Sequence, residues 1–258
     1  MLLLAIGCGG VACGGDRSAS TVAPPGRPAA AREPAAFEID HLWIAAAPGA
    51  PERTAFERAG FRIAPAVNAH EGQGTSSVTV ELDNGFLELI YPDPAVSVAP
   101  NLQTVHAQFQ KRVDWRASGY SPFGIGIRKL AAAPARFPFP TFQVTAPWMD
   151  GRFMEILTPR EMPSAVRLFV PAHPSIGPDA DPVDPATRIH PNQTHRITAL
   201  HVVAPAADTL PPAAHYLAER GIVTFDVGGA WLLEATLDDG AQHIERDLRP
   251  TLPVVLRY

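Results

Sequence analysis

The sequence lacks the features that identify several large classes of protein. Charged residues make up only 18% of the chain, the formal net charge is −5, and the basic residues are scattered. Because nucleic acids are bound through clustered positive charge, we expect no nucleic-acid partner. The chain also lacks a phosphate-binding Gly-Lys-Ser/Thr loop, a dinucleotide fingerprint, a Gly-x-Ser-x-Gly turn and a His-Glu-x-x-His pair. Any chemistry must therefore come from a site without one of these motifs.

Cysteine is nearly absent, and its position is informative. The only two cysteines, Cys8 and Cys13, fall within the first 13 residues, so the rest of the chain has no thiol nucleophile. The apolar run Leu2–Ile6 is too short to span a bilayer and is typical of a targeting segment. Each cysteine follows small residues in a pattern that resembles the lipobox of bacterial lipoprotein signals, which implies lipidation of Cys8 or Cys13.

Residues 1–36 are therefore interpreted as a lipoprotein-type signal and a tether. Ser, Pro, Ala and Arg dominate residues 16–36 without periodicity, which favours a flexible segment. We expect an extracytoplasmic lipoprotein, anchored to the membrane in the periplasm or cell envelope, whose only membrane contact is the lipid.

Residues 37–258 are predicted to form one domain of repeated α+β units. Residues 37–94 predict the order βαβββ, with strands at Phe37–Ala46, at Phe61, at Thr75–Leu82 and at Phe86–Tyr91 and a helix over 51–59. Residues 195–248 predict the same order, with strands at Ile197–Val203, Ile222–Phe225, Trp231–Leu237 and Gln242–Arg246, a helix over Leu210–Arg220 and a hairpin turn at Asp238–Gly240. Two full units are therefore expected.

A degenerate third unit is expected between them, over residues 101–174. It has a helical pattern over Asn101–Trp115 and strand patterns at Phe123–Arg128, Arg152–Leu157 and Val166–Val170. Residues 175–194 are rich in proline and aspartate and predict an irregular loop.

The repeats place polar residues at matching points of apolar strands. His41 lies between Ile39 and Trp43 on one predicted strand face, and His201 is its equivalent in the last unit. Glu88 likewise shares a face with Phe86 and Ile90, and register aligns it with His243. A carboxylate among apolar neighbours is costly unless it is paired, hydrogen-bonded or bound to a cation. The pattern therefore predicts a metal-binding or ligand-binding cup.

The strand order, together with the segments Asp40–Leu42, His70–Thr75 and Gly85–Ile90, resembles the vicinal oxygen chelate (VOC) superfamily and its glyoxalase-like branch. The resemblance covers about residues 37–247. It implies an α+β fold in which repeated βαβββ modules form a half-open, cup-shaped mixed β-sheet with helices on the outside. It also implies divalent-metal ligands from the first and fourth strands, where His41 and Glu88 stand.

The expected metal is Zn, Fe, Mn, Ni or Co, because imidazole and carboxylate suit these ions. His41, Glu88, His201 and His243 are the candidate ligands, and two alternatives to His243 stay open. Glu245 lies on the same predicted face as His243, and Glu155 would serve if the middle unit completes the cup. A cup built from the first and middle units would leave the site incomplete, because the middle strand offers no side-chain ligand. The protein would then bind a ligand without catalysis.

Substrate contacts are expected from residues near the third strand. Glu88 and His70 are the candidate catalytic residues, and His70, Gly74, Thr75 and Trp43 are the candidate substrate-binding residues. Gly74 allows close backbone approach, and Thr75 can donate a hydrogen bond. The alternative role for His70 is to stabilise the turn. His173, between two prolines, is interpreted as a loop residue.

Two functions are therefore expected as alternatives. The first is a metal-dependent lyase, isomerase or dioxygenase that acts on a small oxygen-rich molecule. The second is a lipid-anchored protein that binds a small ligand on the same concave face without turnover. Modules of this kind also pair between chains, so a homodimer stays open.

Overall fold

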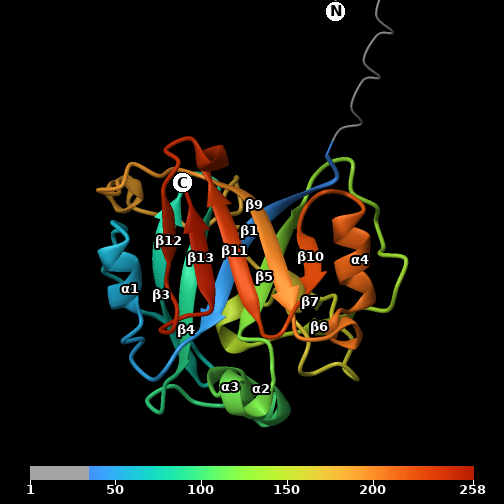
Figure 1. Cartoon of the computed structure of the whole chain (residues 1–258). Helices are drawn as coiled ribbons and strands as arrows, with labels where there is room; N and C mark the ends of the chain where they lie inside the picture. Colours follow the sequence, from blue (N-terminus) through green and yellow to red (C-terminus); the bar gives the residue numbers. More distant parts are fainter. Residues whose placement is uncertain (1–34) are drawn as a thin grey trace, which may run out of the picture. The chain divides into compact units, whose positions relative to one another are not determined.

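Two mixed β-sheets form the framework of the computed structural model, which describes residues 35–258 (Figure 1). The predicted lipoprotein signal lies outside the described residues. The first sheet has the strand order β2-β3-β4-β1-β5-β8-β7-β6. Its strands are β1 (Phe37–Ala45), β2 (Asn68–His70), β3 (Thr75–Leu82), β4 (Gly85–Pro92), β5 (Phe123–Lys129), β6 (Phe142–Val144), β7 (Met154–Ile156) and β8 (Arg167–Val170).

The second sheet is built entirely from the last quarter of the chain. It has the order β10-β9-β11-β13-β12. Its strands are β9 (Ile197–Ala204), β10 (Thr224–Val227), β11 (Leu232–Leu237), β12 (Glu245–Asp247) and β13 (Val254–Arg257).

Few helices accompany the sheets. The α-helices are α1 (Arg53–Arg58), α2 (Gln103–Val113), α3 (Trp115–Ser118) and α4 (Pro212–Ala218). Short 3₁₀ turns lie at Pro100–Leu102, Pro147–Met149, Pro185–Arg188, Ala207–Thr209 and Asp238–Gly240. Among residues 35–258, no helix has both the length and the apolar character needed to cross a bilayer.

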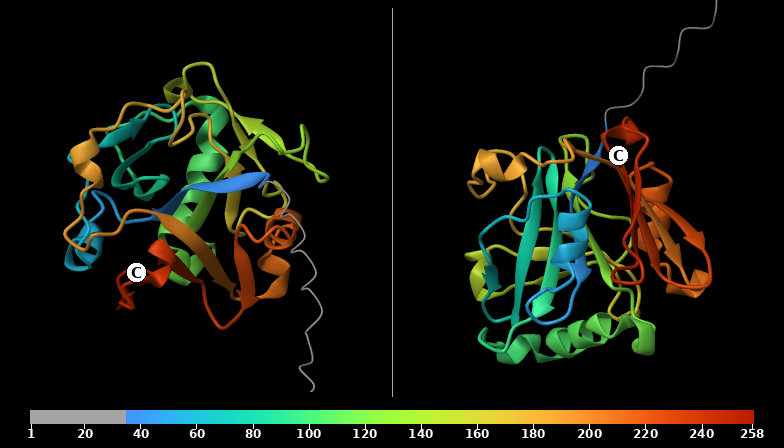
Figure 2. Two further views of the ribbon diagram at one scale, coloured as in Figure 1. Left: turned by 90° about the horizontal axis from the view of Figure 1, so that it is seen from above. Right: turned by 60° about the vertical axis from the view of Figure 1, so that its left-hand side comes forward.

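The main core lies between the two sheets. It joins buried residues of the first sheet, such as Leu42 and Leu87, to buried residues of the second, such as Val202 and Leu233. Seen from above, the second sheet lies on one side of β1 and the rest of the curled first sheet lies on the other, and α2 crosses behind β1 (Figure 2). One face of the first sheet thereby packs against the core, and the opposite, concave face does not.

Helix α2 packs across one end of that concave face. Phe109 of α2 forms a small cluster with Ala45 and Ile90, and Trp43 packs edge-on against Phe109 with the ring centroids 6.0 Å apart. The curled, half-barrel first sheet confirms the predicted fold class. It combines the first unit with the middle unit, so the structure answers which units form the cup.

The last unit repeats the first only in part. In the first unit β1 pairs in parallel with β4, the fourth strand, whereas in the last unit β9 pairs in parallel with β10, the second strand. The hairpin predicted at Asp238–Gly240 does not form, because β11 pairs in parallel with β13 and β12 lies beyond β13. A repeat in the order of elements therefore does not give a repeat in strand pairing.

Strand prediction failed where pairing rather than pattern decides the structure. The strand predicted at Phe61 is wrong, since residues 61–63 have no regular structure and the strand lies at Asn68–His70. The short strands β6 and β13 were not predicted, and each forms by pairing with a neighbouring strand, β6 with β7 and β13 with β11.

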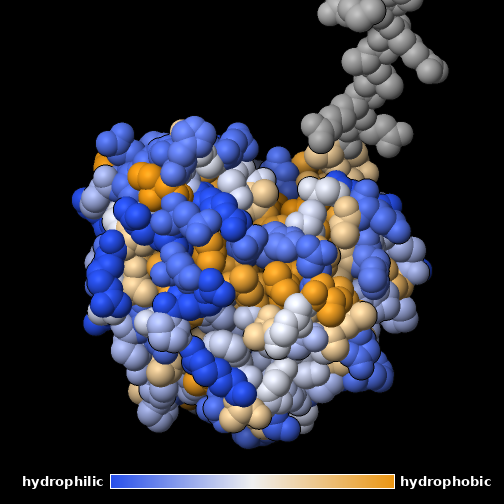
Figure 3. Space-filling model, viewed as in Figure 1, coloured by the Kyte–Doolittle hydropathy of each residue, from blue (hydrophilic) through white to orange (hydrophobic). Residues whose placement is uncertain are grey.

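The two sheets are also linked by polar contacts. Asn84, at the turn between β3 and β4, accepts a hydrogen bond from the Ile197 N–H (2.9 Å) and donates one to the Ile197 carbonyl (2.7 Å). The Tyr258 hydroxyl donates to the Ala59 carbonyl at 2.7 Å. The outer face of the second sheet is less polar than its surroundings, with hydrophobic residues gathered over β9, β10 and β11 (Figure 3).

Candidate ligand cavity

A cavity of about 730 Å³ opens on the concave face of the first sheet. Its volume is in the range that holds a small organic ligand. One wall comes from β1, β3 and β4 of the first unit, the opposite wall from β6, β7 and β8 of the middle unit, and α2 contributes one end. The end of the middle unit and the irregular loop predicted at residues 175–194 supply further wall residues at 171–175 and 181–183.

His41 reaches this cavity because β1 contains a β-bulge. Ile39 pairs with Ile127 and His41 with Gly126, so Asp40 is an extra residue on β1. The bulge turns Ile39 into the core with Ile127, while His41 and Trp43 face the cavity. The prediction that Ile39 shares the face of His41 is therefore wrong, since strict alternation fails at a bulge.

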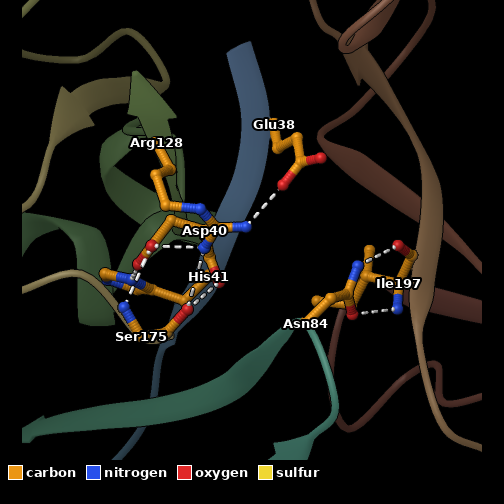
Figure 4. Close-up of polar contacts among 7 residues, drawn as sticks. All are labelled: Glu38, Asp40, His41, Asn84, Arg128, Ser175 and Ile197. Atoms are coloured by element: carbon orange, nitrogen blue, oxygen red, sulfur yellow. Dashed lines mark hydrogen bonds and ion pairs between the residues drawn. The ribbon is translucent and has the colours of Figure 1, made fainter. Parts of the chain in front are cut away.

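Asp40 holds the His41 ring in place (Figure 4). His41 Nδ1 donates to Asp40 Oδ1 at 2.7 Å, and Asp40 Oδ2 accepts from Arg128 (3.1 Å) and from the Ser175 N–H (3.0 Å). Burial raises the pKa of Asp40, but the His41 hydrogen bond, the Ser175 N–H and the charge of Arg128 outweigh it and lower the pKa. The ionised Asp40 thus fixes Nδ1 of His41 as the protonated nitrogen.

Two glycines of β5 make room for the rings of β1. Gly126 lies opposite His41, and Gly124 lies opposite Trp43. A Cβ added at Gly124 would stand 2.0 Å from the Trp43 ring, and one at Gly126 would stand 3.1 Å from the His41 ring. β5 carries glycine opposite His41 and Trp43, because a larger side chain there would collide with these rings. The middle unit therefore offers no metal ligand on this strand.

Glu88 and His70 lie next to each other on the cavity wall. Glu88 is 7% exposed and shares its cavity face with Phe86 and Ile90, as predicted. Its Oε1 lies 3.6 Å from His70 Nε2, too far for a hydrogen bond. Within residues 35–258, no hydrogen bond reaches the Glu88 carboxylate, which therefore faces the cavity unpaired.

The other ring nitrogen of His70, Nδ1, is hydrogen-bonded and fixes the ring. Its Nδ1 hydrogen-bonds with Thr75 Oγ1 at 3.0 Å, and its ring lies 5.1 Å from the ring of Trp148. Burial lowers the pKa of His70, and the charge of Glu88 opposes that shift without cancelling it. His70 is therefore neutral near pH 7.

The other two predicted substrate-binding residues do not line the cavity. Thr75 is fully buried and positions His70 and Gln73 through its hydroxyl. Gly74 has φ +73°, and an added Cβ would stand 2.7 Å from His106 Nδ1, so the glycine allows the turn to pack on α2. Both residues support the site from behind its wall.

The structure does not bring the remaining predicted metal ligands to the cavity. His201, on β9 of the second sheet, lies 3.4 Å from Asp226. His243, with φ +56°, and Glu245 are exposed near β12. Glu155 faces away from the cavity and pairs with Lys129 at 2.8 Å, because its neighbours on β7 point inward.

The donors at the cavity do not make a complete metal site as they stand. Among residues 35–258, no three His, Cys, Asp or Glu side chains are grouped closely enough to hold an ion. His41 and Glu88 do line the same cavity, and His70 is adjacent to Glu88. A divalent metal in a protein usually takes three or more protein ligands. Metal binding at His41 and Glu88 therefore stays a prediction.

Several cavity residues were missed in the sequence. Arg112, Arg160 and Arg167 line it, as do Trp148 and His173, which the sequence suggested to be a loop residue. Arg167 could have been found, because it stands two residues before Phe169 in an apolar strand, as Glu88 stands two residues before Ile90. Trp148 and His173 belong to irregular segments and carry no periodic signal.

A known family covers the segment that builds this cavity. The family model described as a glyoxalase-like domain matches residues 39–218. The match begins in β1 and ends with α4, so it includes both walls of the cavity and α2. No curated protein matches the chain.

Proposed function

The chain belongs to the glyoxalase-like domain family, and on that basis we propose that it is an enzyme that moves a proton on a small oxygen-rich molecule bound in the cavity. The reaction type is that of an isomerase or lyase. The site residues are Glu88 and His70, with His41 and Trp43 on the adjoining wall.

The observation that carries this proposal is the unpaired carboxylate of Glu88. Burying a carboxylate without a hydrogen bond costs free energy of folding, so such a group is typical of a functional site. Glu88 can accept a proton from a carbon next to a substrate carbonyl, and the electron pair then moves to the carbonyl oxygen. In an α-hydroxy carbonyl compound, return of the proton to the former carbonyl carbon, with transfer of the hydroxyl proton to the other oxygen, gives an isomer. Loss of a leaving group from the carbon beta to the carbonyl gives an elimination product instead.

His70 supports the same step. Its neutral ring, 3.6 Å from Glu88, offers a second group that can take or give a proton. Its bond to Thr75 and its contact with Trp148 fix the ring, so that Nε2 rather than Nδ1 is presented to Glu88. His41 presents Nε2, because Nδ1 is occupied by Asp40.

The test is exchange of carbon-bound hydrogen. The full chain is incubated in D₂O with dihydroxyacetone, 2-hydroxyacetophenone or phenylpyruvate, and loss of the C–H signal is followed by proton NMR. We expect exchange above the buffer rate with at least one compound. Glu88→Gln should lower the protein-catalysed rate by about 10²- to 10⁴-fold, the range for removal of a general base.

Glu57→Gln is the matched control, since Glu57 is exposed on α1 and lies outside the cavity. It should exchange at the wild-type rate. Equal rates for Glu88→Gln and Glu57→Gln would show that Glu88 is not the base.

The alternative function is binding without turnover. The observation in its favour is that the cup joins the first and middle units, so that His201 is not part of the cavity. Binding of one of the three compounds with no exchange in any of them would favour this alternative.

Two predictions from the sequence are not part of this mechanism. A divalent metal at His41 and Glu88 stays a prediction, which elemental analysis of the purified chain tests directly. The lipid anchor and the extracytoplasmic location likewise stay predictions, tested by mass analysis of the mature N-terminus.

A further inference from the structure

Three arginines line the cavity, and none of them has an acidic partner within residues 35–258. Arg112 lies on α2, Arg160 follows β7 and Arg167 begins β8. Some arginines outside the cavity are paired with carboxylates, for example Arg128 with Glu38 at 2.6 Å and Arg257 with Glu234 at 2.8 Å. The cavity therefore holds three guanidinium groups that no carboxylate of the described residues pairs with.

Arg112 is held by main-chain atoms only. It donates to the carbonyls of Ser121 and Pro163, both at 2.7 Å, and its guanidinium lies 5.8 Å from the centroid of the Trp43 ring. It is 2% exposed. Two carbonyls satisfy its hydrogen bonds but leave its charge without a counter-ion.

Arg167 is less constrained. The alternation of β8 puts Arg167 and Phe169 on the cavity wall and Leu168 in the core. In the described part of the chain, its guanidinium makes no hydrogen bond and no ion pair. Burial lowers the pKa of Arg167 to about 10, and the charge of Arg160 adds to that shift. The planar fork of five N–H donors is thus available to a ligand.

The walls beside these arginines are aromatic. Arg160 stacks on Phe142 at 3.8 Å, and Trp43, Phe109 and Phe169 also line the cavity. The acidic residues that line it, Glu81, Glu88 and Asp181, form no ion pair with Arg167. An occupant that suits both features has an apolar body and an anionic group.

We infer that Arg167, flanked by Arg112 and Arg160, is a subsite for the anionic oxygens of an organic acid whose apolar body lies against the aromatic wall. A carboxylate and a phosphate monoester share this chemistry, since a guanidinium binds either through two parallel hydrogen bonds. The inference rests on the proposed function in using the same cavity, and it names the class of substrate.

Calorimetric titration of the full chain tests the subsite. The probes are 4-phenylbutyrate, its uncharged amide 4-phenylbutanamide, and phenyl phosphate. We expect the wild type to bind at least one anion more tightly than the amide. Arg167→Met should weaken that anion by about 10- to 100-fold, the loss of a hydrogen-bonded charge pair, and should leave the amide within about twofold.

Arg246→Met is the matched control, since Arg246 is exposed on β12 and outside the cavity. It should bind all probes as the wild type does. Retained binding of the amide by Arg167→Met, with an unchanged far-ultraviolet circular dichroism spectrum, shows that the variant is folded. Preference for 4-phenylbutyrate over phenyl phosphate identifies a carboxylate, and the reverse a phosphate.

Two results would overturn the inference, and they differ in their effect on the proposed function. Equal affinity of the wild type for amide and anions, or equal losses in Arg167→Met and Arg246→Met, would remove the anionic subsite and leave the Glu88 proposal intact. Failure of all three probes to bind would remove the subsite too, whereas the hydrogen-exchange test alone decides on Glu88.

Discussion

His41 and His201 occupy matching positions of two similar strands, but their rings have different partners. His41 Nδ1 is tied to the buried Asp40, whereas His201 Nδ1 hydrogen-bonds with Thr224 and its Nε2 lies near the exposed Asp226. A carboxylate that accepts from one imidazole nitrogen orients the other, as in metal and catalytic sites. At the residue scale, the hydrogen-bond partner of the ring therefore distinguishes His41, which lines the cavity, from His201, which lies at the surface of the second sheet.

His70 predicts a pH dependence of stability. Burial lowers its pKa below the ordinary value of 6.5, so the unfolded chain binds this proton at higher pH than the native chain does. The free energy of unfolding consequently falls as the pH drops through 6.5, and it keeps falling until native His70 is protonated. His70→Gln removes this contribution. Urea denaturation at about pH 7.5 and about pH 5.5 should show a smaller difference between the two pH values in His70→Gln than in the wild type.

His215→Gln, at an exposed position on α4, is the control and should keep the wild-type difference. His190, whose pKa is also lowered by burial, contributes equally to wild type and variants and cancels in the comparison. An unchanged pH dependence in His70→Gln would mean that the native ring is as easily protonated as the unfolded one.

At the element scale, β5 shows how a strand can serve a site without supplying a functional group. Gly124 leaves the space that the Trp43 ring fills, since a Cβ there would stand 2.0 Å from the ring. Gly124→Ala should therefore push Trp43 out of its place and destabilise the fold by about 1–3 kcal/mol, the usual cost of overpacking. Urea denaturation measures the loss, and Trp43 fluorescence should change with it.

Gly229→Ala provides the matched control, because a Cβ at Gly229 meets nothing within 4 Å and its φ is not positive. Its stability should stay within about 0.5 kcal/mol of the wild type. If Gly124→Ala is as stable as Gly229→Ala, Trp43 does not need the space above β5.

Most strands and the cavity face of Glu88 could be predicted because they follow period-2 alternation. Thr75–Leu82 was predicted with its observed ends, and Glu88 faces the cavity with Phe86 and Ile90 as expected. Alternation does not reveal a bulge, so the turn of Ile39 into the core was missed. It also does not reveal which strands pair. β11 pairs with β13, and His243 lies outside the strands, so it has no place equivalent to that of Glu88 in β4.

At the scale of the whole molecule, the two sheets share one core rather than having one each. Buried Leu233 of β11 and buried Leu87 of β4 belong to the same cluster, and Asn84 joins the sheets through two hydrogen bonds to Ile197. A region that loses its packing partner loses most of its stability, so the cavity sheet should not persist without the second sheet.

This shared core predicts that a substitution far from the cavity destabilises the cavity sheet. Leu233→Ala should reduce the free energy of unfolding by about 2–5 kcal/mol, through lost burial and the space left behind. Native-state hydrogen exchange, read by mass spectrometry of peptides, should then show equal losses of protection in β4 and in β9. Val227→Ala, at an exposed position of β10, should leave protection in both strands unchanged. Loss of protection in β9 alone would instead mean that the sheets unfold separately, and the cavity would then owe its shape to the first sheet and α2 only.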